Sequence, residues 1–179
     1  KITKELRLEG VFPSVNQLYE EIRKKGEEYG VSLKYPKISE TDNLPSIPQN
    51  WIWLRNEELL KYVTSGSRDW KKYYSSSGCI FIRTQNINTN KLDLSDVAYV
   101  VLPPKVEGKR SLVEQGDLLM TITGANVGKV AFIEKEIPEA YVSQSVALMK
   151  YLDTGLTKYM WYYFQSEHFG QGLIKGLVY

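Results

Sequence analysis

The chain has 179 residues, with 23 basic and 21 acidic side chains, one cysteine and one histidine. This length supports one domain, or one domain with an appended segment. Because Cys79 and His168 stand alone, an internal disulfide and a Cys/His zinc site are excluded. No apolar stretch is as long as a membrane span and no signal-peptide core is evident, so we expect a cytoplasmic protein without a membrane partner.

Residues 1–43 are predicted to form an N-terminal helical segment and linker. Ser14 and Gln17 have the spacing of a capping box, and apolar residues then recur at helical intervals. Prolines between residues 31 and 50 predict an extended linker. The second domain is therefore expected over residues 44–179, with its compact part beginning near Trp51.

The second domain has the pattern of a strand-dominated α+β fold with flanking helices. A short helix is predicted at 57–63, closed by Gly66, and an aromatic C-terminal helix at about 156–166. Apolar runs predict strands at 51–54, 79–83, 97–102, 118–123, 129–133 and 146–151. Gly124 and Gly128 predict a sharp turn between two of these strands.

Basic residues are concentrated in one part of this domain. Residues 68–110 contain eight basic and four acidic side chains, whereas residues 111–150 contain three basic and five acidic ones. Such a local excess favours an anion-binding face, with nucleic acid as the leading partner. From charge alone, a solvated surface explains the pattern equally well.

The glycine-rich turn does not have the pattern of a nucleotide-binding loop. Only three residues separate Gly124 from Gly128, and Val130 stands where a phosphate-binding loop needs a hydroxyl residue. The sequence that follows is typical of a strand rather than of the start of a helix. An adenine-nucleotide site in this turn is therefore not expected.

A metal-dependent nuclease is a less favoured alternative. Asp96, Glu107 and Lys109 match the spacing with which such enzymes hold a metal ion and orient water. However, Glu107 and Lys109 follow a Pro-Pro pair and flank Gly108, which predicts a loop rather than a rigid strand.

Two polar segments have the composition of a DNA-contacting surface. Arg68–Tyr74 is basic and aromatic, and residues 83–88 combine arginine with glutamine and asparagine. Arginine and lysine pair with phosphates or with guanine, whereas asparagine and glutamine pair with adenine. Gln144 has the same capacity. A polar loop without a ligand is the alternative explanation.

The order of the motifs resembles the target recognition domain of the DNA specificity subunit of type I restriction–modification systems. The resemblance covers about residues 44–179 and is carried by these segments: Leu44-Pro45, Trp51-Ile-Trp-Leu54, Phe81-Ile-Arg-Thr-Gln-Asn-Ile87, Val113-Glu-Gln-Gly-Asp-Leu-Leu-Met120, Thr123-Gly124, Gly128-Lys-Val-Ala131 and Ser143-Gln144. It implies a curved, mostly antiparallel sheet.

The resemblance also implies a non-catalytic DNA reader that binds no cofactor itself. S-adenosylmethionine, ATP and Mg²⁺ would belong to partner subunits. The implied partners are double-stranded DNA, adenine methyltransferase subunits and, indirectly, a restriction subunit. Because one recognition domain reads one half of a bipartite site, a second recognition domain or a homodimer is expected.

The resemblance gives each polar segment an expected role in DNA binding. Lys71, Lys72, Lys109 and Arg110 are expected at phosphates, and Arg83, Gln85, Asn86, Asn126 and Gln144 at base edges. Gly124 and Gly128 would allow close approach of the backbone, and Arg68, Tyr74, Thr123 and Lys129 complete the predicted site. The rival hypothesis is a protein-docking module that uses the aromatic C-terminal helix and contacts no DNA.

Overall fold

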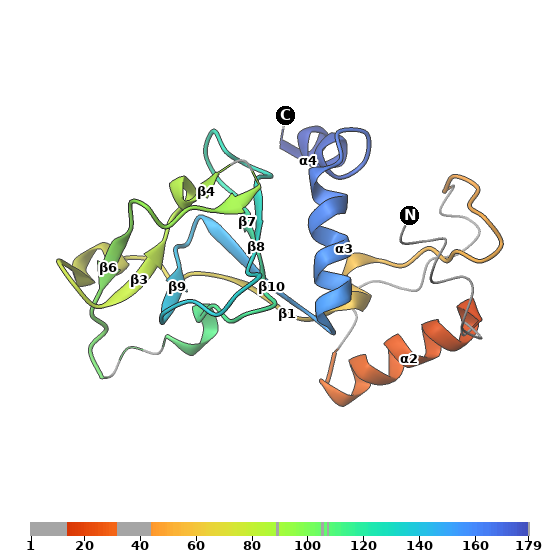
Figure 1. The fold of residues 1–179 in the computed structure, drawn as a ribbon, viewed down its shortest axis with the longest axis horizontal. Helices are drawn as coiled ribbons and strands as arrows, with labels where there is room; N and C mark the ends of the chain where they lie inside the picture. The colour runs from red at the N-terminus through yellow and green to blue at the C-terminus, as the bar shows by residue number, and fades with distance from the viewer. Residues whose placement is uncertain (1–13, 32–43, 89, 105, 107, 179) are drawn as a thin grey trace. The chain divides into compact units, whose positions relative to one another are not determined.

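A computed structural model of the chain describes residues 14–31, 44–88, 90–104, 106 and 108–178 (Figure 1). The chain divides into two compact units, Lys1–Leu59 and Leu60–Tyr179. The sequence-based boundary between residues 43 and 44 stays a prediction. Within the described ranges, no helix is both long enough and apolar enough to cross a membrane.

The first unit contains the predicted N-terminal helix, α2 (Val15–Glu28). Its capping box is present, because the Gln17 amide donates to Ser14 Oγ at 3.3 Å and the Ser14 amide donates to Gln17 Oε1 at 2.7 Å. These two bonds satisfy backbone donors that a helix start otherwise leaves unpaired.

Two predictions for residues 51–63 were wrong. Residues 51–54 form no strand, and the Trp51 amide closes a turn onto the Pro48 carbonyl at 2.9 Å. The helix expected at 57–63 is a 3₁₀ turn, η2 (Asn56–Leu59), followed by strand β1 (Leu60–Ser65). Pairing of β1 with a distant strand outweighs the local tendency to form a helix, and the Tyr-Val-Thr run at 62–64 favours an extended backbone.

The second unit is α+β and mostly antiparallel, as predicted, but its strands divide between two sheets and a ribbon. The first sheet has the order β1-β10-β7-β8, with β7 (Leu118–Thr121), β8 (Val130–Phe132) and β10 (Val146–Tyr151). The second has the order β2-β6-β3-β9, with β2 (Tyr74–Ser75), β3 (Cys79–Ile82), β6 (Ala98–Val100) and β9 (Ala140–Val142). The ribbon pairs β4 (Ile87–Asn88) with β5 (Lys91–Leu92).

Strand β3 separates two apolar clusters because its side chains alternate between two faces. Ile80 and Ile82 belong to the main core, which also includes residues of β7, β8, β9 and β10. Phe81 points to an aromatic cluster with Trp70, Val100 and Tyr141. In this cluster the ring centroids of Trp70 lie 5.8 Å from Phe81 and 5.5 Å from Tyr141. β3 and β9 run parallel to each other.

Two helices end the chain. α3 (Thr154–Gln165) occupies the segment of the predicted aromatic helix, and α4 (Gly170–Val178) was not predicted. α3 is capped at its N-terminus by Asp153, whose carboxylate accepts the Leu156 amide at 3.0 Å, and the helix packs against β8 and β10 (Figure 1). Its Trp161 donates through Nε1 to the Asn90 carbonyl at 2.9 Å, which fixes the helix to the ribbon turn.

The Gly-Asp-Leu-Leu segment (residues 116–119) begins as a turn and leads into β7, and its Asp117 is bound to Lys150 of β10. Gly116 has a φ of +93°, a conformation that glycine adopts without strain. The Asp117 carboxylate is buried, and it accepts the Glu114 amide at 2.8 Å and Lys150 Nζ at 2.7 Å. Burial raises the pKa of Asp117 and outweighs the opposing effect of Lys150. Hydrogen bonding to Lys150 lowers the pKa of Glu114. The segment therefore has a structural role.

Candidate nucleic-acid interface

Several strands end at one place in the second unit, and short backbone hydrogen bonds join them there. The Ser143 amide donates to the Ile82 carbonyl at 2.8 Å, and the Gly66 amide donates to the Ser143 carbonyl at 3.2 Å. The Ile122 amide donates to the Ser145 carbonyl at 2.9 Å. We call residues 66–68, 82–85, 122–123 and 143–145 the strand-end junction.

The strand-end junction brings together five of the predicted site residues. They come from segments that are distant in sequence: Arg68, Arg83, Gln85, Thr123 and Gln144. Four of these five side chains are exposed, and that of Arg83 is partly exposed. Exposed polar side chains are thus carried by segments whose backbones are joined where strands end, which is an arrangement suited to holding recognition side chains rigidly.

Gly66 has a packing role rather than the predicted role of ending a helix. A Cβ atom built on it would lie 1.8 Å from the Val142 carbonyl oxygen. No side chain fits at that distance without moving the backbone of β9. The strand-end junction therefore depends on the absence of a side chain at Gly66.

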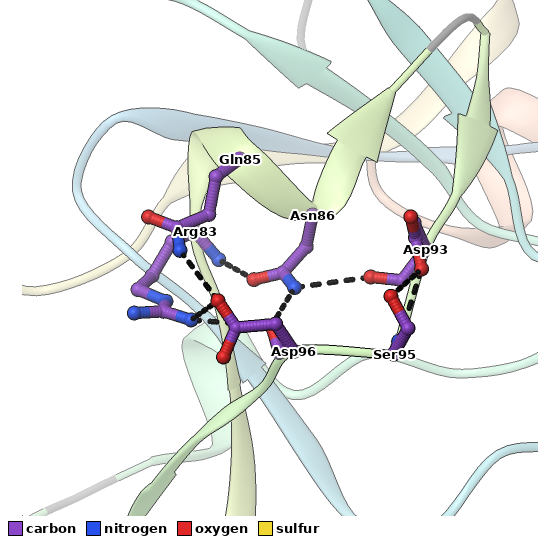
Figure 2. Close-up of polar contacts among 6 residues, drawn as sticks. All are labelled: Arg83, Gln85, Asn86, Asp93, Ser95 and Asp96. Atoms are coloured by element: carbon purple, nitrogen blue, oxygen red, sulfur yellow. Dashed lines mark hydrogen bonds and ion pairs between the residues drawn. The ribbon is translucent and has the colours of Figure 1, made fainter.

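Arg83 and Gln85 converge on one acidic residue, Asp96 (Figure 2). Arg83 Nη2 donates to the Asp96 carbonyl at 3.2 Å and lies 3.8 Å from Asp96 Oδ2. Gln85 Nε2 donates to the same Oδ2 at 3.2 Å. Arg83 Nε is buried and has no hydrogen-bond partner in the described part of the chain. Two predicted base readers thus contact Asp96: Gln85 donates a hydrogen bond to its carboxylate, whereas Arg83 donates to its carbonyl and forms a longer ion pair with the carboxylate.

The structure corrects the role predicted for Asn86. Its side chain is only 2% exposed. Its Oδ1 accepts the Arg83 amide at 3.0 Å, and its Nδ2 donates to the carbonyls of Asp93 and Asp96 at 3.0 and 2.7 Å. Because these bonds use the amide inside the protein, Asn86 holds the 93–96 loop in place and is not available to a base edge (Figure 2).

The glycine loop, residues 122–129, connects β7 and β8. Its two glycines, Gly124 and Gly128, have different surroundings. Gly124 has a φ of +85° and open space where a Cβ would lie. Gly128, in contrast, is buried against α4, where Gln171 Nε2 donates to its carbonyl at 2.8 Å and a Cβ would lie 3.0 Å from Ile174 Cγ2. The prediction that Gly128 permits approach of a ligand is therefore replaced by an internal packing role, whereas the role of Gly124 stays a prediction. Asn126 and Lys129 are partly exposed in this loop.

The predicted phosphate-binding lysines are displayed by a 3₁₀ turn, η3 (Trp70–Tyr73). Trp70 is buried in the aromatic cluster, and this anchor leaves Lys71 and Lys72 exposed. Lys72 Nζ lies 5.1 Å from the centroid of the Tyr73 ring. The next residue, Tyr74, is 44% exposed and packs edge-on against Phe81 at 5.6 Å.

A second 3₁₀ turn, η5 (Lys109–Ser111), carries the other predicted phosphate contacts. Lys109 and Arg110 are exposed, and Arg110 Nη2 donates to Thr64 Oγ1 on β1 at 3.4 Å. Gly108, just before this turn, lies against the Tyr141 ring, where a Cβ would be 2.6 Å from Cε1. Both basic turns therefore adjoin the aromatic cluster.

The arrangement of acidic residues does not favour the nuclease alternative. The Asp96 carboxylate faces a guanidinium group and an amide, and Glu107 lies outside the described residues. Among the residues that are described, no three His, Cys, Asp or Glu side chains are grouped so that they could hold a metal ion.

Comparison with solved structures identifies the fold. One similar chain comes from work on the structural basis of complex assembly and conformational transition of the type I R-M (restriction–modification) system; its TM-score is 0.51 at 16% identity, over 86% of this chain and 40% of that one. The HsdS subunit from Thermoanaerobacter tengcongensis gives a TM-score of 0.50 at 13% identity, over 88% of this chain and 39% of its own. The chain has the fold of type I specificity subunits. No protein-family model and no curated protein matches the sequence.

This specificity-subunit fold agrees with the resemblance carried by the sequence motifs. The chain spans about two fifths of the length of the two solved chains that it matches. The Asp96 contact and the close packing at Gly66 are the features of the candidate interface that sequence reasoning missed. No local signal marks either of them, because each joins segments that are distant in the sequence.

Proposed function

We propose that this chain is a target recognition domain, which reads one half of a bipartite DNA site as all or part of a type I specificity subunit. The proposal is supported by the strand-end junction, where backbone hydrogen bonds join the segments that carry Arg68, Arg83, Gln85 and Gln144 within the specificity-subunit fold. A second recognition domain or a second copy of the chain supplies the other half-site.

In this proposal, base edges are read at the strand-end junction and the glycine loop, and phosphates are held by the basic turns. Because Arg83 Nε is buried and Nη2 is bound to Asp96, Arg83 can offer a single guanidinium donor to guanine O6 or N7. Gln85 and Gln144 each have the donor–acceptor pair that adenine requires. Lys71, Lys72, Lys109 and Arg110 neutralise phosphates and carry no sequence information. The chain itself is non-catalytic, and S-adenosylmethionine, ATP and Mg²⁺ act on the methyltransferase and restriction subunits that it directs.

Replacement of Lys72 by alanine is expected to weaken binding about equally on all DNA sequences. Because Lys72 is exposed beside the aromatic cluster, its loss removes a phosphate contact without changing the fold. The slope of log affinity against log salt concentration should decrease by about 1. Fluorescence anisotropy with several unrelated duplexes over a salt series measures both quantities.

Lys158→Ala is the matched control for this prediction. Lys158 is an equally exposed lysine on α3, outside the candidate interface. Lys158→Ala should leave unchanged both the affinity for DNA and the slope of log affinity against log salt concentration. If the two alanine variants behave alike, the basic turn of Lys72 does not contact DNA.

The exposed aromatic residues of α3 favour a second candidate function. Tyr159 is 57% exposed and Tyr162 is 56% exposed, which suits a helix that docks another protein. In this alternative the chain would assemble with a methyltransferase without contacting DNA.

Co-expression with the neighbouring methyltransferase subunit separates the two functions. Methylated adenines are mapped for the wild-type chain and for a chain in which residues 67–145 are exchanged for those of another specificity subunit. A methylation motif that changes with the exchanged segment supports DNA recognition. An unchanged motif supports docking alone and contradicts the proposed function.

A further inference from the structure

Asp96 differs from the other acidic residues that the structure describes in the second unit because two proposed base readers contact it. Arg83 Nη2 and Gln85 Nε2 both approach its Oδ2, at 3.8 and 3.2 Å. The Asp96 side chain is 82% exposed, whereas that of Arg83 is 24% exposed. The carboxylate therefore lies at the solvent boundary of the strand-end junction, where a DNA ligand would meet it together with its two partners.

The backbone at Asp96 is held in place independently of its carboxylate. Asn86 Nδ2 and Arg83 Nη2 both donate to the Asp96 carbonyl, at 2.7 and 3.2 Å. The Asp93 amide donates to the Asn86 carbonyl at 2.7 Å, which fixes the other end of the same loop. Loss of the carboxylate charge should therefore leave the loop where it is.

A carboxylate in this position has two effects on its neighbours. It restrains the long side chains of Arg83 and Gln85, which would otherwise lose conformational freedom when they bind DNA. It also repels phosphate, so that Arg83 is less suited to a backbone contact that any DNA sequence can provide. Both effects favour base-edge contacts over phosphate contacts.

We propose that Asp96 is a specificity-determining residue, whose carboxylate orients Arg83 and Gln85 toward base edges and keeps phosphate away from them. This inference rests on the proposed function of the chain in DNA recognition. Asp96 acts through its two neighbours and by repulsion. Its removal therefore changes the ratio between specific and non-specific binding.

The test is selection from a pool of randomised DNA duplexes by the full chain. Asp96→Asn should lower the discrimination at the base pairs read by Arg83 and Gln85 by about tenfold. At the same time its affinity for unselected DNA should rise, because one negative charge is lost next to the DNA. Asp96→Glu keeps the carboxylate and should retain most of the wild-type preference.

Asp93→Asn is the matched control because it removes the same charge from the same loop. The Asp93 carboxylate accepts the Ser95 amide at 2.9 Å and the Ser95 hydroxyl at 2.7 Å, on the side of the loop away from Arg83 (Figure 2). The Asp93→Asn variant should raise the affinity for non-specific DNA, as Asp96→Asn does, and should leave the selected motif unchanged.

The outcomes separate failure of this inference from failure of the proposed function. If the wild-type chain selects a motif and Asp96→Asn selects it equally well, the role of Asp96 is refuted and DNA recognition stands. Equal loss of discrimination in Asp93→Asn and Asp96→Asn also refutes it, since charge alone would then suffice. If the wild-type chain binds DNA but selects no motif, the proposed function itself is wrong. Asp96→Asn is not compared alone if it also has a lower unfolding temperature. If Asp96→Glu then selects the wild-type motif, the inference is supported, because the wild-type chain and Asp96→Glu share the carboxylate that Asp96→Asn lacks.

Discussion

Replacement of Lys150 by methionine is expected to lower the free energy of unfolding by about 3–5 kcal/mol at neutral pH, as removal of one partner of a buried ion pair does. Lys150 Nζ donates to the Asp117 carboxylate at 2.7 Å, and the exposed side-chain fractions of these residues are 14% and 6%. Methionine preserves the apolar stem of the lysine but leaves a buried carboxylate without its cation. Chemical denaturation followed by circular dichroism measures the loss.

The loss in Lys150→Met should depend on pH in a defined direction. Burial already raises the pKa of Asp117 above its ordinary value of 3.8, and removal of the cation raises it further. A group whose pKa is raised in the folded state stabilises the fold at low pH, and this contribution is lost as pH rises through the folded-state pKa. The deficit relative to the wild type should therefore shrink as pH falls toward 3.8.

Glu114 adds little to this effect and works in the same direction, because Lys150→Met also removes the stability that Lys150 provides by lowering the pKa of Glu114. It also binds Lys150, at 2.8 Å, but its side chain is 64% exposed and solvent screens the pair. Its lowered pKa contributes stability above its ordinary value of 4.5, and that contribution is lost as pH falls.

Lys135→Met, at an exposed lysine, is the control and should leave the free energy of unfolding nearly unchanged. A deficit of Lys150→Met that is equally small, or independent of pH, would contradict the buried-pair account.

The second large effect is expected for Gly66→Ala, which should destabilise the chain by about 3 kcal/mol, the upper part of the usual range for overpacking. The added Cβ would lie 1.8 Å from the Val142 carbonyl oxygen, so β9 and the end of β1 must separate. Because Ser143 and Gln144 directly follow β9, the same movement should disturb the strand-end junction and reduce sequence discrimination.

Gly176→Ala provides a control for the effect of alanine itself. Gly176 lies within α4, and a Cβ built there meets no atom within 4 Å. This change should be neutral or stabilise the helix by about 1 kcal/mol. Thermal unfolding of the two variants gives the comparison. If Gly66→Ala is as stable as the wild type, the tight contact at the strand-end junction is not present.

Local sequence signals predicted those elements whose stability is local. The capping box at Ser14 and Gln17 is formed by residues three positions apart, and both of its bonds are present. The apolar run at 146–151 corresponds to β10, which is paired on both sides and largely buried. Such elements follow from spacing and side-chain type alone.

Predictions failed where a distant contact decides the structure. Residues 60–63 suited a short helix locally, but pairing of Leu60 with Tyr151 makes them a strand. Strand β9 (Ala140–Val142) has only three residues and is stabilised by parallel pairing with β3. α4 contains three glycines and was not expected to be helical. Its residues Gln171 and Ile174 pack against the glycine loop, and tertiary contact thus outweighs the low helix propensity of glycine.

The same limit applies to the candidate interface. Asn86 and Gln85 are adjacent polar residues in one run, yet the first is buried and the second is exposed. The difference arises because the 93–96 loop folds over Asn86 and supplies its acceptors. Residue type predicted the chemistry of this run, but only the fold shows which side chains face solvent.

The central claim, that the strand-end junction reads DNA sequence, is tested most directly by selection from randomised duplexes with a Gln85→Ala/Gln144→Ala double variant. Both side chains are exposed, so the fold should be retained, and Gln49→Ala in the first unit is the control. We predict that the wild-type chain and Gln49→Ala enrich one motif. The double variant should bind DNA with the same salt dependence but lose about 1–3 kcal/mol of discrimination at each base pair that these glutamines read. Enrichment of the same motif by the double variant, to the same degree, would contradict the account.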